Sequence, residues 1–159
     1  MKNLERRRMG SGVRVMTEQG NERIEVAEIQ LANRLSELDR LHAFFDGIGH
    51  RSNWTDRLRW DLTLSCEELL TNTITYGYPQ GGDHLITLAV NAEPGRIEVK
   101  LEDDAIPFNP LEQDEPDITL SVEDRAIGGL GIFFVKRMMN EIIYERTLTG
   151  NRLTLRKIW

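Results

Sequence analysis

Alternation of apolar and polar residues predicts one β-strand near the N-terminus and two later pairs of strands. In a strand every second side chain lies on the same face, so a period of two indicates a sheet with one buried face. The first such stretch is Arg23–Gln30. Glu93–Gly95 and Thr149–Asn151 join the later pairs, as hairpin turns do. The paired stretches are residues 84–90 with 96–102, and residues 141–148 with 152–159.

Apolar residues three or four positions apart predict a first helix after the first strand. Ser36 followed by Asp39 resembles a helix start, with an acid that reaches back toward the capping residue. Gly47 and Gly49 are expected to end the helix, because glycine favours helix termini. The apolar stripe consists of Leu38, Leu41, Phe45 and Ile48.

Two further helices are predicted in the middle and in the last third of the chain. The longer one runs from about Thr55 to Tyr76 and is stopped by Pro79 and the glycine pair that follows. The other runs from about Leu130 to Asn140, and its adjacent Phe133 and Phe134 are expected in the core. The expected inward face of the longer helix consists of Leu58, Leu62, Cys66, Leu69, Thr73 and Tyr76.

The order of the elements predicts an α/β (α+β) two-layer sandwich, with a mostly antiparallel sheet and helices packed on one face. A chain of 159 residues fits a single domain. Residues 23–159 are expected to form it, and residues 1–22 to be a flexible polar lead-in. Residues 103–127 carry prolines and acids without periodicity. Loops of that length in a compact domain are usually functional or disordered.

Composition narrows the classes of function. A net charge of −6 argues against a nucleic-acid-binding surface, which usually shows as a basic stripe. Cys66 is the single cysteine, so no intrachain disulfide forms, which is typical of a cytoplasmic protein. We expect it to be a small buried residue and not a reactive thiol. The sequence has no apolar run near the ~20 residues that cross a bilayer.

The first chemical motif lies on the long predicted helix. Glu68 and Asn72 are four residues apart, so their side chains lie on the same face. An amide oxygen can bind magnesium without adding negative charge beside phosphates, and magnesium needs only one or two protein ligands. A carboxylate one turn away can deprotonate an attacking hydroxyl. Taken alone, the pair also fits the solvated edge of an amphipathic helix.

The second motif follows the strand that ends near Glu102. Asp103, held by a turn at a strand end, can accept a hydrogen bond from the exocyclic amine of adenine. Ala105 is small enough to let the backbone approach a base, and Pro107 stiffens the exit into the loop. Asp104 is expected to be exposed. Alternatively, this is an acidic turn that ends a strand.

The third motif places three glycines at a helix start. Gly128, Gly129 and Gly131 leave backbone N–H groups open to a phosphate, and the helix N-terminus adds partial positive charge. The glycines also fit a tight turn. Arg125 either contacts a terminal phosphate or balances the surrounding acids, and the sequence leaves both open.

Together the three motifs resemble the histidine-kinase-like ATPase (GHKL) superfamily, and within it the anti-sigma-factor serine/threonine kinases of bacterial partner-switching systems. EELLTNTITYGY resembles the asparagine box, DDAIPFNP the first glycine box, and GGLGIFFVKRMMNEIIYER the second box with its following strand. The resemblance covers about residues 23–159 and implies a Bergerat-type ATP-binding fold. Ala105 departs from it, because the family typically has glycine there.

The resemblance implies a role for each motif residue. Asn72 would bind magnesium and Glu68 would be the general base. Asp103 would bind adenine beside Ala105 and Pro107, and residues 109–127 would form the nucleotide lid. The phosphates would be held by Arg125, Gly128, Gly129, Leu130 and Gly131.

The function implied is an ATP- and magnesium-dependent serine/threonine protein kinase that regulates transcription as an anti-sigma factor in the cytoplasm. It would phosphorylate a small antagonist protein and bind a sigma factor, without contacting nucleic acid or membrane. Members of the family often form homodimers. One alternative is a non-catalytic ATP switch that sequesters a protein partner. A sensor histidine kinase fits less well. Its phosphoacceptor would have to be one of the three histidines His42, His50 and His84. His42 lies beside the apolar stripe of the first helix and does not precede an acid in a dimerising hairpin.

Overall fold

The fold is known from a computed structural model, which describes residues 7–9, 13–18, 24–112 and 130–159. In these residues the sheet has seven strands in the order β1-β2-β3-β4-β5-β7-β6, and all neighbours pair antiparallel. The strands are β1 (Arg7–Met9), β2 (Val13–Glu18), β3 (Ile24–Ala32), β4 (Leu85–Glu93), β5 (Arg96–Asp103), β6 (Glu141–Arg146) and β7 (Asn151–Ile158).

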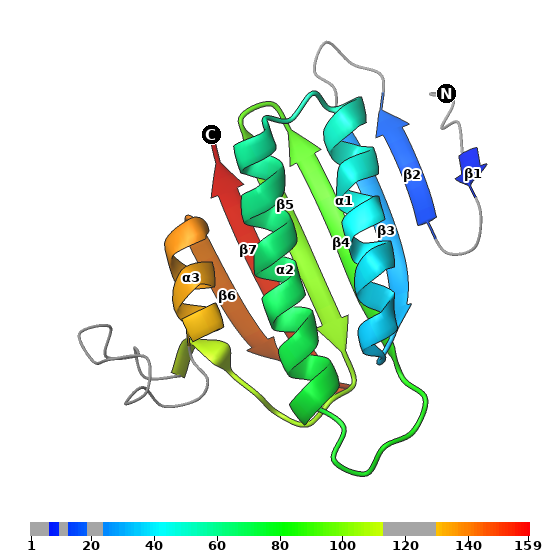
Figure 1. Cartoon of the computed structure of the whole chain (residues 1–159), viewed down its shortest axis with the longest axis vertical. Coiled ribbons are helices and arrows are strands. Elements are labelled where there is room, and N and C mark those ends of the chain that lie inside the picture. Colours follow the sequence, from blue (N-terminus) through cyan, green and yellow to red (C-terminus); the bar gives the residue numbers. More distant parts are fainter. Residues whose placement is uncertain (1–6, 10–12, 19–23, 113–129) are drawn as a thin grey trace.

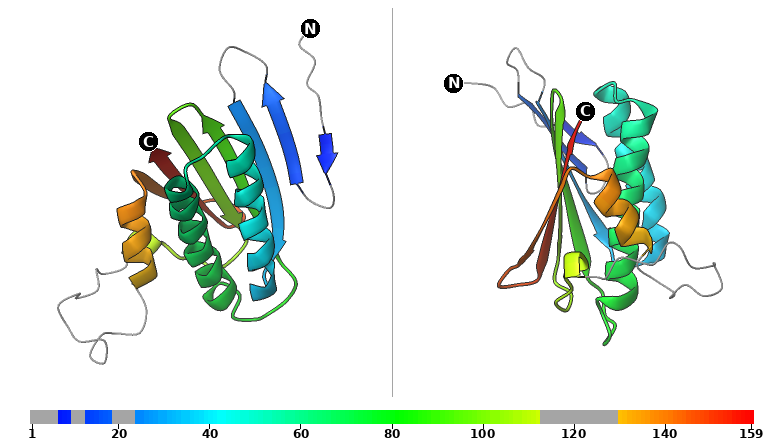
Figure 2. Two further views of the ribbon diagram at one scale, coloured as in Figure 1. Left: turned by 45° about the horizontal axis from the view of Figure 1, so that its top comes forward. Right: turned by 90° about the vertical axis from the view of Figure 1, so that its left-hand side faces the viewer.

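Three α-helices cover one face of the sheet, and the other face carries none in the described residues (Figures 1 and 2). This confirms the predicted two-layer α+β architecture with a mostly antiparallel sheet. The helices are α1 (Leu38–Arg51), α2 (Asp56–Tyr76) and α3 (Leu130–Met138), and two short 3₁₀ turns are η1 (Leu35–Glu37) and η2 (Pro110–Glu112).

The core lies between the helices and the strands β3, β4, β5 and β7. Alternating side chains of β4 and β5 point inward, as their period of two predicts. They meet the apolar stripes of α1 and α2. The largest fully buried side chains are Phe45, Ile29, Leu31, Leu41, Ile48, Leu62, Leu70, Ile86, Leu88, Ile97, Leu155 and Val90.

The N-terminal strands were not predicted. The polar pattern indicated only a lead-in before residue 23, whereas β2 pairs with β3 and β1 pairs with β2. The apolar alternation in this region is confined to the short run Val13–Glu18, and pairing at a sheet edge depends on backbone hydrogen bonds more than on apolar side chains. The division into a lead-in over residues 1–22 and one domain over residues 23–159 remains a prediction.

The first helix begins and ends differently from the prediction. Ser36 does not cap it. The Glu37 carboxylate instead accepts a hydrogen bond from the Ala32 N–H at 3.2 Å and pairs with Arg40. The helix continues past Gly47 to Arg51. Gly49 is buried, and a Cβ there would lie 3.2 Å from the Arg59 side chain, so this glycine permits close packing of α1 against α2.

Two predicted core positions are wrong. Tyr76 is 69% exposed at the end of α2, although the other apolar positions of its predicted inward face are buried. Phe134 is 46% exposed on α3, and Phe133 is half-buried. The buried residues of α3 are Ile132 and Val135, and Met139, directly after the helix, continues the spacing of three and four residues.

Candidate functional site

The long helix α2 presents the first pair of candidate residues. Thr55 caps its N-terminus by accepting a hydrogen bond from the Leu58 N–H at 3.2 Å. Glu68 and Asn72 are half-buried and lie one turn apart. Neither side chain forms a hydrogen bond or ion pair with another described residue. Both polar groups are therefore available to a ligand.

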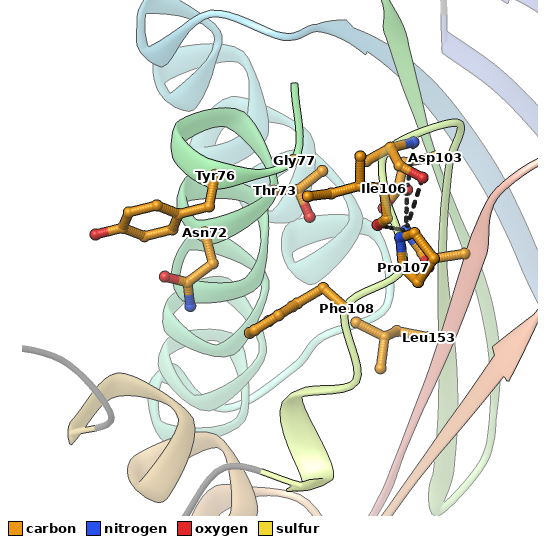
Figure 3. A pocket seen from close by; sticks show the side chains of 11 residues that line it. Asn72, Thr73, Tyr76, Gly77, Asp103, Ile106, Pro107, Phe108 and Leu153 are labelled. Carbon is orange, nitrogen blue, oxygen red and sulfur yellow. Dashed lines mark hydrogen bonds between the residues drawn. The ribbon is translucent and has the colours of Figure 1, made fainter. Parts of the chain in front are cut away.

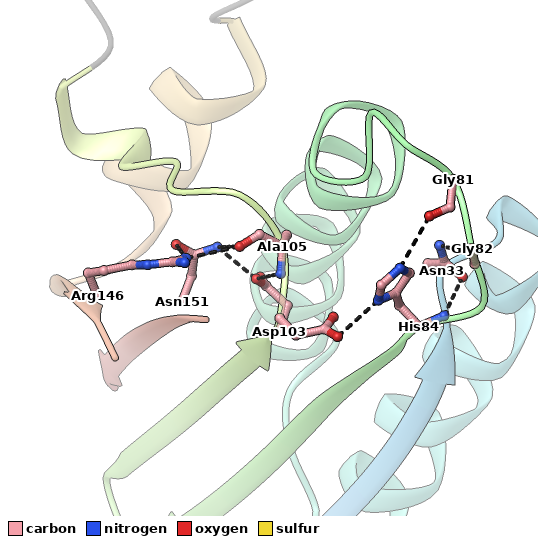
Figure 4. Close-up of polar contacts among 9 residues, drawn as sticks. Asn33, Gly81, Gly82, His84, Asp103, Ala105, Arg146 and Asn151 are labelled. Atoms are coloured by element: carbon pink, nitrogen blue, oxygen red, sulfur yellow. Dashed lines mark hydrogen bonds and ion pairs between the residues drawn. The ribbon is translucent and has the colours of Figure 1, made fainter. Parts of the chain in front are cut away.

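Asp103 ends β5 and is half-buried. Its Oδ1 accepts hydrogen bonds from the Ala105 N–H at 3.0 Å and from Asn151 Nδ2 at 2.7 Å (Figure 4). Oδ2 accepts none from another side chain among the described residues. Burial raises the pKa of the Asp103 carboxyl, while the hydrogen bonds from Asn151 and Ala105 oppose this shift.

The end of α2 and the segment after β5 enclose a pocket between them (Figure 3). Its cavity volume is about 80 Å³, below the ~300–1,000 Å³ of small-molecule sites. Four residues predicted from the sequence meet here, namely Asn72, Asp103, Ala105 and Pro107. The full lining is Asn72, Thr73, Tyr76, Gly77, Asp103, Ala105, Ile106, Pro107, Phe108, Asn151 and Leu153.

Ala105, the residue that departs from the family pattern, is buried against Gly77. A Cβ on Gly77 would lie 2.8 Å from the Ala105 methyl, so the methyl fits because residue 77 has no side chain. The Ile106 N–H also donates to the Gly77 carbonyl at 3.1 Å. The two segments thus pack backbone to backbone at the floor of the pocket.

Glu68 lies outside the pocket lining, one turn along α2 from Asn72. It contacts the start of α3, where its carboxylate lies against Gly131. Leu130 begins α3 and is 38% exposed. The other predicted phosphate-binding residues, Arg125, Gly128 and Gly129, lie outside the described residues, as does the lid predicted over residues 109–127 beyond Glu112.

The sequence motifs did not identify a second group of polar residues around Asp103. Asn151 is 4% exposed, and its Oδ1 accepts hydrogen bonds from Tyr144 Oη at 2.8 Å and Arg146 Nη1 at 3.0 Å. One signal was present in the sequence. Asn151 occupies an inward position of the β7 alternation that continues with Leu153 and Leu155, and a polar residue there needs partners.

The structure also bears on the single cysteine, on metal-binding clusters and on membrane-spanning helices. Cys66 is fully buried, and burial raises the pKa of its thiol, so it is the structural residue expected. Among these residues no cluster of three or more His, Cys, Asp or Glu side chains could hold a metal ion. No helix in the described part is long and apolar enough to cross a membrane.

The arrangement offers three kinds of chemistry side by side. Asp103 supplies a hydrogen-bond acceptor at the floor of a pocket with the apolar walls Ile106, Phe108 and Leu153. Asn72 supplies an amide at the same pocket. Glu68 supplies a carboxylate one turn further along, next to the glycine at the start of α3. A flat base with an amine substituent and a charged tail that extends along α2 matches this order.

Comparison with known proteins agrees with the geometry. Residues 31–157 match the model of the histidine kinase-like ATPase domain. The chain is 27% identical to the serine/threonine-protein kinase BtrW of Bordetella bronchiseptica over 70% of this chain and 79% of the relative. It is 28% identical to the anti-sigma F factor of Priestia megaterium, over 57% of this chain and 63% of that protein.

A third relative is the serine-protein kinase RsbW of Listeria monocytogenes, 24% identical over 60% of this chain and 64% of the relative. The chain thus spans just under two thirds of two of these relatives. The family match covers most of the chain, including α2, β5, the start of α3 and the closing hairpin. The chain therefore belongs to the histidine kinase-like ATPase domain family.

Proposed function

We propose that this chain is an ATP- and magnesium-dependent serine/threonine protein kinase that acts as an anti-sigma-type regulator in partner switching. The observation that carries the proposal is the convergence of Asn72, Asp103, Ala105 and Pro107 on one pocket in a histidine kinase-like ATPase domain. The names of the relatives, two kinases and an anti-sigma factor, support the finer assignment.

The residues of the pocket fit an adenine base. In this proposal Asp103 Oδ2 accepts a hydrogen bond from the exocyclic amine, because no other side chain among the described residues donates to it. Ala105 and Gly77 keep the floor narrow, and Pro107 limits the conformations of the segment above it. The walls of Ile106 and Phe108 offer apolar area to a flat ring.

The metal and phosphates lie toward α3 in this proposal. The amide of Asn72, which has no partner among the described residues, would hold Mg²⁺ together with phosphate oxygens and water. Magnesium supplies charge neutralisation during phosphoryl transfer. Leu130 and Gly131 at the start of α3, with Gly128, Gly129 and Arg125, bind the phosphates through backbone N–H groups and positive charge.

Glu68 is the general base of the proposed reaction. Its position one turn from Asn72 supports this role, because its carboxylate would then lie near the phosphates, and no cation among the described residues neutralises it. It accepts the proton of a serine or threonine hydroxyl as that oxygen attacks the γ-phosphorus, while the bond from the γ-phosphorus to the β–γ bridging oxygen breaks and ADP leaves. A positioned base of this kind contributes about 10²–10⁴-fold to the rate.

The proposed partners follow from the same class of protein. A small antagonist protein supplies the serine or threonine, and a sigma factor is bound while the antagonist is phosphorylated. In this proposal the protein works in the cytoplasm, without nucleic acid or membrane contacts, and is able to form a homodimer. The sigma factor is supported by the name of one relative and the serine- or threonine-bearing substrate by the names of two others.

Calorimetry with ATP, with and without Mg²⁺, tests the site. Wild type is expected to bind ATP more tightly with Mg²⁺, and Asn72→Ala to lose this gain, a factor of roughly 10 or more. Asn91→Ala on the open face of the sheet is the matched control, expected to bind as wild type. Equal magnesium dependence in Asn72→Ala and wild type removes the metal assignment.

Phosphate transfer separates the kinase from the alternative, a non-catalytic ATP switch. Wild type and Glu68→Gln are incubated with γ-labelled ATP and a lysate of the source organism, and labelled proteins are resolved on a gel. A small protein labelled on serine or threonine by wild type, and about 10²-fold less by Glu68→Gln, supports the kinase. Tight ATP binding without any labelling favours the switch.

A further inference from the structure

Asn151 lies directly behind the carboxylate that faces the pocket. It is the first residue of β7 and pairs with Asp103 in the register of β5 and β7. Its Nδ2 donates to Asp103 Oδ1 at 2.7 Å and to the Ile106 carbonyl at 3.0 Å. A single buried amide therefore binds both the candidate base-reading side chain and the backbone that follows it.

The orientation of this amide is determined by its neighbours. Arg146 only donates hydrogen bonds, so the Asn151 atom that faces Arg146 Nη1 at 3.0 Å must be the oxygen. The Ile106 carbonyl only accepts, so the atom that faces it must be the nitrogen. Tyr144 Oη adds a second donor to the oxygen at 2.8 Å. The Asn151 amide cannot flip without losing these hydrogen bonds, of which Figure 4 shows the one from Arg146.

Arg146 also holds the same segment directly. Its Nη1 donates to the Ala105 carbonyl at 2.9 Å, so β6, β7 and the turn after β5 form one hydrogen-bonded unit. Gly150 permits this contact. A Cβ at residue 150 would overlap the Asp103 carbonyl oxygen and lie 2.7 Å from Asp104 Cα. The β6–β7 hairpin thus fixes the position of the Asp103 carboxylate.

We propose that Asn151, oriented by Tyr144 and Arg146, is a positioning residue that fixes Asp103 as a hydrogen-bond acceptor, so that the site selects 6-aminopurine over 6-oxopurine nucleotides. The proposal rests on the proposed function, since it assumes that Asp103 contacts the base.

The selectivity follows from counting donors and acceptors. The Ala105 N–H and Asn151 Nδ2 both donate to Oδ1 of Asp103, which leaves Oδ2 as the acceptor for the ligand. A 6-amino group donates to this oxygen. A 6-oxo group is itself an acceptor. Its oxygen would face the Asp103 carboxylate oxygen with no hydrogen between them, and this repulsion weakens the binding of a 6-oxopurine.

Asp103 selects a 6-amino group only while its carboxyl is ionised. Burial and the neighbouring Asp104 raise the pKa of its carboxyl, and the hydrogen bond from Asn151 lowers it. Tyr78 lies near the pair, and Arg146 brings a positive charge to the same segment. Without Asn151 a larger fraction of Asp103 is protonated at a given pH. A protonated carboxyl donates a hydrogen bond and accommodates a 6-oxo group.

The test compares ATP with inosine triphosphate, which carries oxygen at the 6 position of the purine. Affinities are measured by calorimetry at about pH 6 and about pH 8, on either side of neutrality. The variants are Asn151→Leu, which removes the amide at similar volume, and Tyr144→Phe, which removes one hydroxyl. Arg152→Met is the control, because Arg152 pairs with Glu102 and Glu145 outside this network.

Wild type and Arg152→Met are expected to prefer ATP by about 10-fold or more. Asn151→Leu is expected to lose most of this preference, and more of it at the lower pH; Tyr144→Phe is expected to lose about 3-fold, since Arg146 still binds the amide oxygen. If Asn151→Leu does not fold, Tyr144→Phe decides the matter alone.

Two results overturn the inference while leaving the proposed function intact. One is an equal loss of affinity for both nucleotides in Asn151→Leu and in Tyr144→Phe at both pH values. This result is expected if Asn151 only stabilises the local structure and does not affect selectivity. The other is an unchanged preference in both variants. Failure of wild type to bind either nucleotide overturns the proposed function itself, and the inference falls with it.

Discussion

The carboxylate of Glu68 on α2 lies against Gly131 in the first turn of α3. A methyl group added to Gly131 would overlap Glu68 Oε2, and its carbon would lie 2.6 Å from Glu68 Cδ. Glycine at this position therefore determines where the carboxylate of Glu68 can lie. The relationship couples the candidate base to the helix whose start is expected to bind the phosphates.

Gly131→Ala is expected to slow phosphate transfer without unfolding the protein. The overlapping atoms belong to the flexible end of the Glu68 side chain, which can rotate away, so the melting temperature changes little. The displaced carboxylate no longer reaches the attacking hydroxyl, and a shift of about 1 Å in such a group costs about 10²-fold in rate. Single-turnover transfer from γ-labelled ATP measures the effect, and ADP affinity is measured alongside.

Gly47→Ala provides the control for that substitution. Its Cβ would meet only the end of the Arg51 side chain at 3.2 Å, on a helix remote from the pocket. Transfer should equal that of wild type, with stability raised by about 0.5–1 kcal/mol, as is usual for glycine to alanine in a helix. A Gly131→Ala protein with the transfer rate of wild type would contradict the role given to Glu68.

A second glycine, Gly150, is expected to be indispensable for stability. A Cβ there would overlap the Asp103 carbonyl oxygen and lie 2.6 Å from its carbon, and these backbone atoms cannot move aside as a side chain does. Gly150→Ala must separate the β6–β7 turn from the end of β5. We expect a loss of about 3 kcal/mol in the free energy of unfolding, measured in urea.

Gly81→Ala distinguishes this overlap from the cost of backbone conformation. Gly81 has a φ of 67° and open space around it, so alanine there meets no atom within 4 Å. The expected loss is about 1–2 kcal/mol, the cost of the left-handed region for a residue with a Cβ. Equal losses at positions 81 and 150 would show that the contact with Asp103 is unimportant.

The periodic elements were predictable because their signals are local. Alternation located β3 to β7, and the stripe of α2 located that helix within one residue of its observed bounds. The end of α1 was not predictable by the same means. Gly49 looks like a stop signal in sequence, but its actual partners are Arg59 and Trp54, which come close only after α1 packs on α2.

The candidate site divides along the same line. Asp103, Ala105 and Pro107 form a short motif, and the pocket contains all three. Asn151 belongs to no motif, because its hydrogen-bond partners Asp103 and Tyr144 are 48 and seven residues away in the chain. The one signal in the sequence was the presence of a polar residue, Asn151, at an inward position of β7. Long-range polar contacts of this kind depend on strand register, which the sequence pattern does not specify.

His84 and Asp104 are expected to make stability depend on pH. His84 Nδ1 and Asp104 Oδ2 are 2.9 Å apart, and the His84 ring stacks on Tyr78 with centroids separated by 4.3 Å. The hydrogen bond to Asp104 raises the pKa of His84, and the hydrogen bond to His84 lowers the pKa of Asp104. The pair connects the segment after α2 to the residue next to Asp103 (Figure 4).

The sign of the dependence follows from the two shifts. The raised pKa of His84 gives a stabilisation that is complete below about pH 6.5, its ordinary value, and is lost as pH rises through the folded value. The lowered pKa of Asp104 gives one that is present above about pH 3.9 and is lost as pH falls through the folded value. The pair therefore stabilises the protein most between these limits.

Urea midpoints at about pH 5.5 and about pH 8 test this expectation. Wild type should exceed His84→Gln by more at the lower pH than at the higher one. Asp104→Asn should remove the same pH-dependent difference, and the double variant should add nothing further, because both substitutions break one interaction. A difference that is equal at the two pH values would contradict the coupling.

The last prediction concerns a buried ion pair that fixes α2 on the sheet. Lys157 on β7 and Asp61 on α2 are 3.0 Å apart, with side chains 18% and 8% exposed. Lys157 also donates to the Met138 carbonyl at the end of α3, and Arg57 shares the Asp61 carboxylate at 2.9 Å. One ammonium group thus joins β7 to both helices that border the candidate site.

Lys157→Met leaves the Asp61 carboxylate buried with only the exposed Arg57 as partner. Breaking one side of a buried pair costs about 3–5 kcal/mol, and the remaining Arg57 places this loss at the lower end of that range. The double variant Asp61→Leu with Lys157→Met removes both charges. It should recover most of the stability, because apolar side chains avoid the free-energy cost of removing two charged groups from water. Urea unfolding of the two single variants and the double variant measures the coupling. If the double variant were as unstable as the sum of the singles, Asp61 and Lys157 would act independently, and the arrangement of α2 and α3 around the pocket would depend on apolar packing alone.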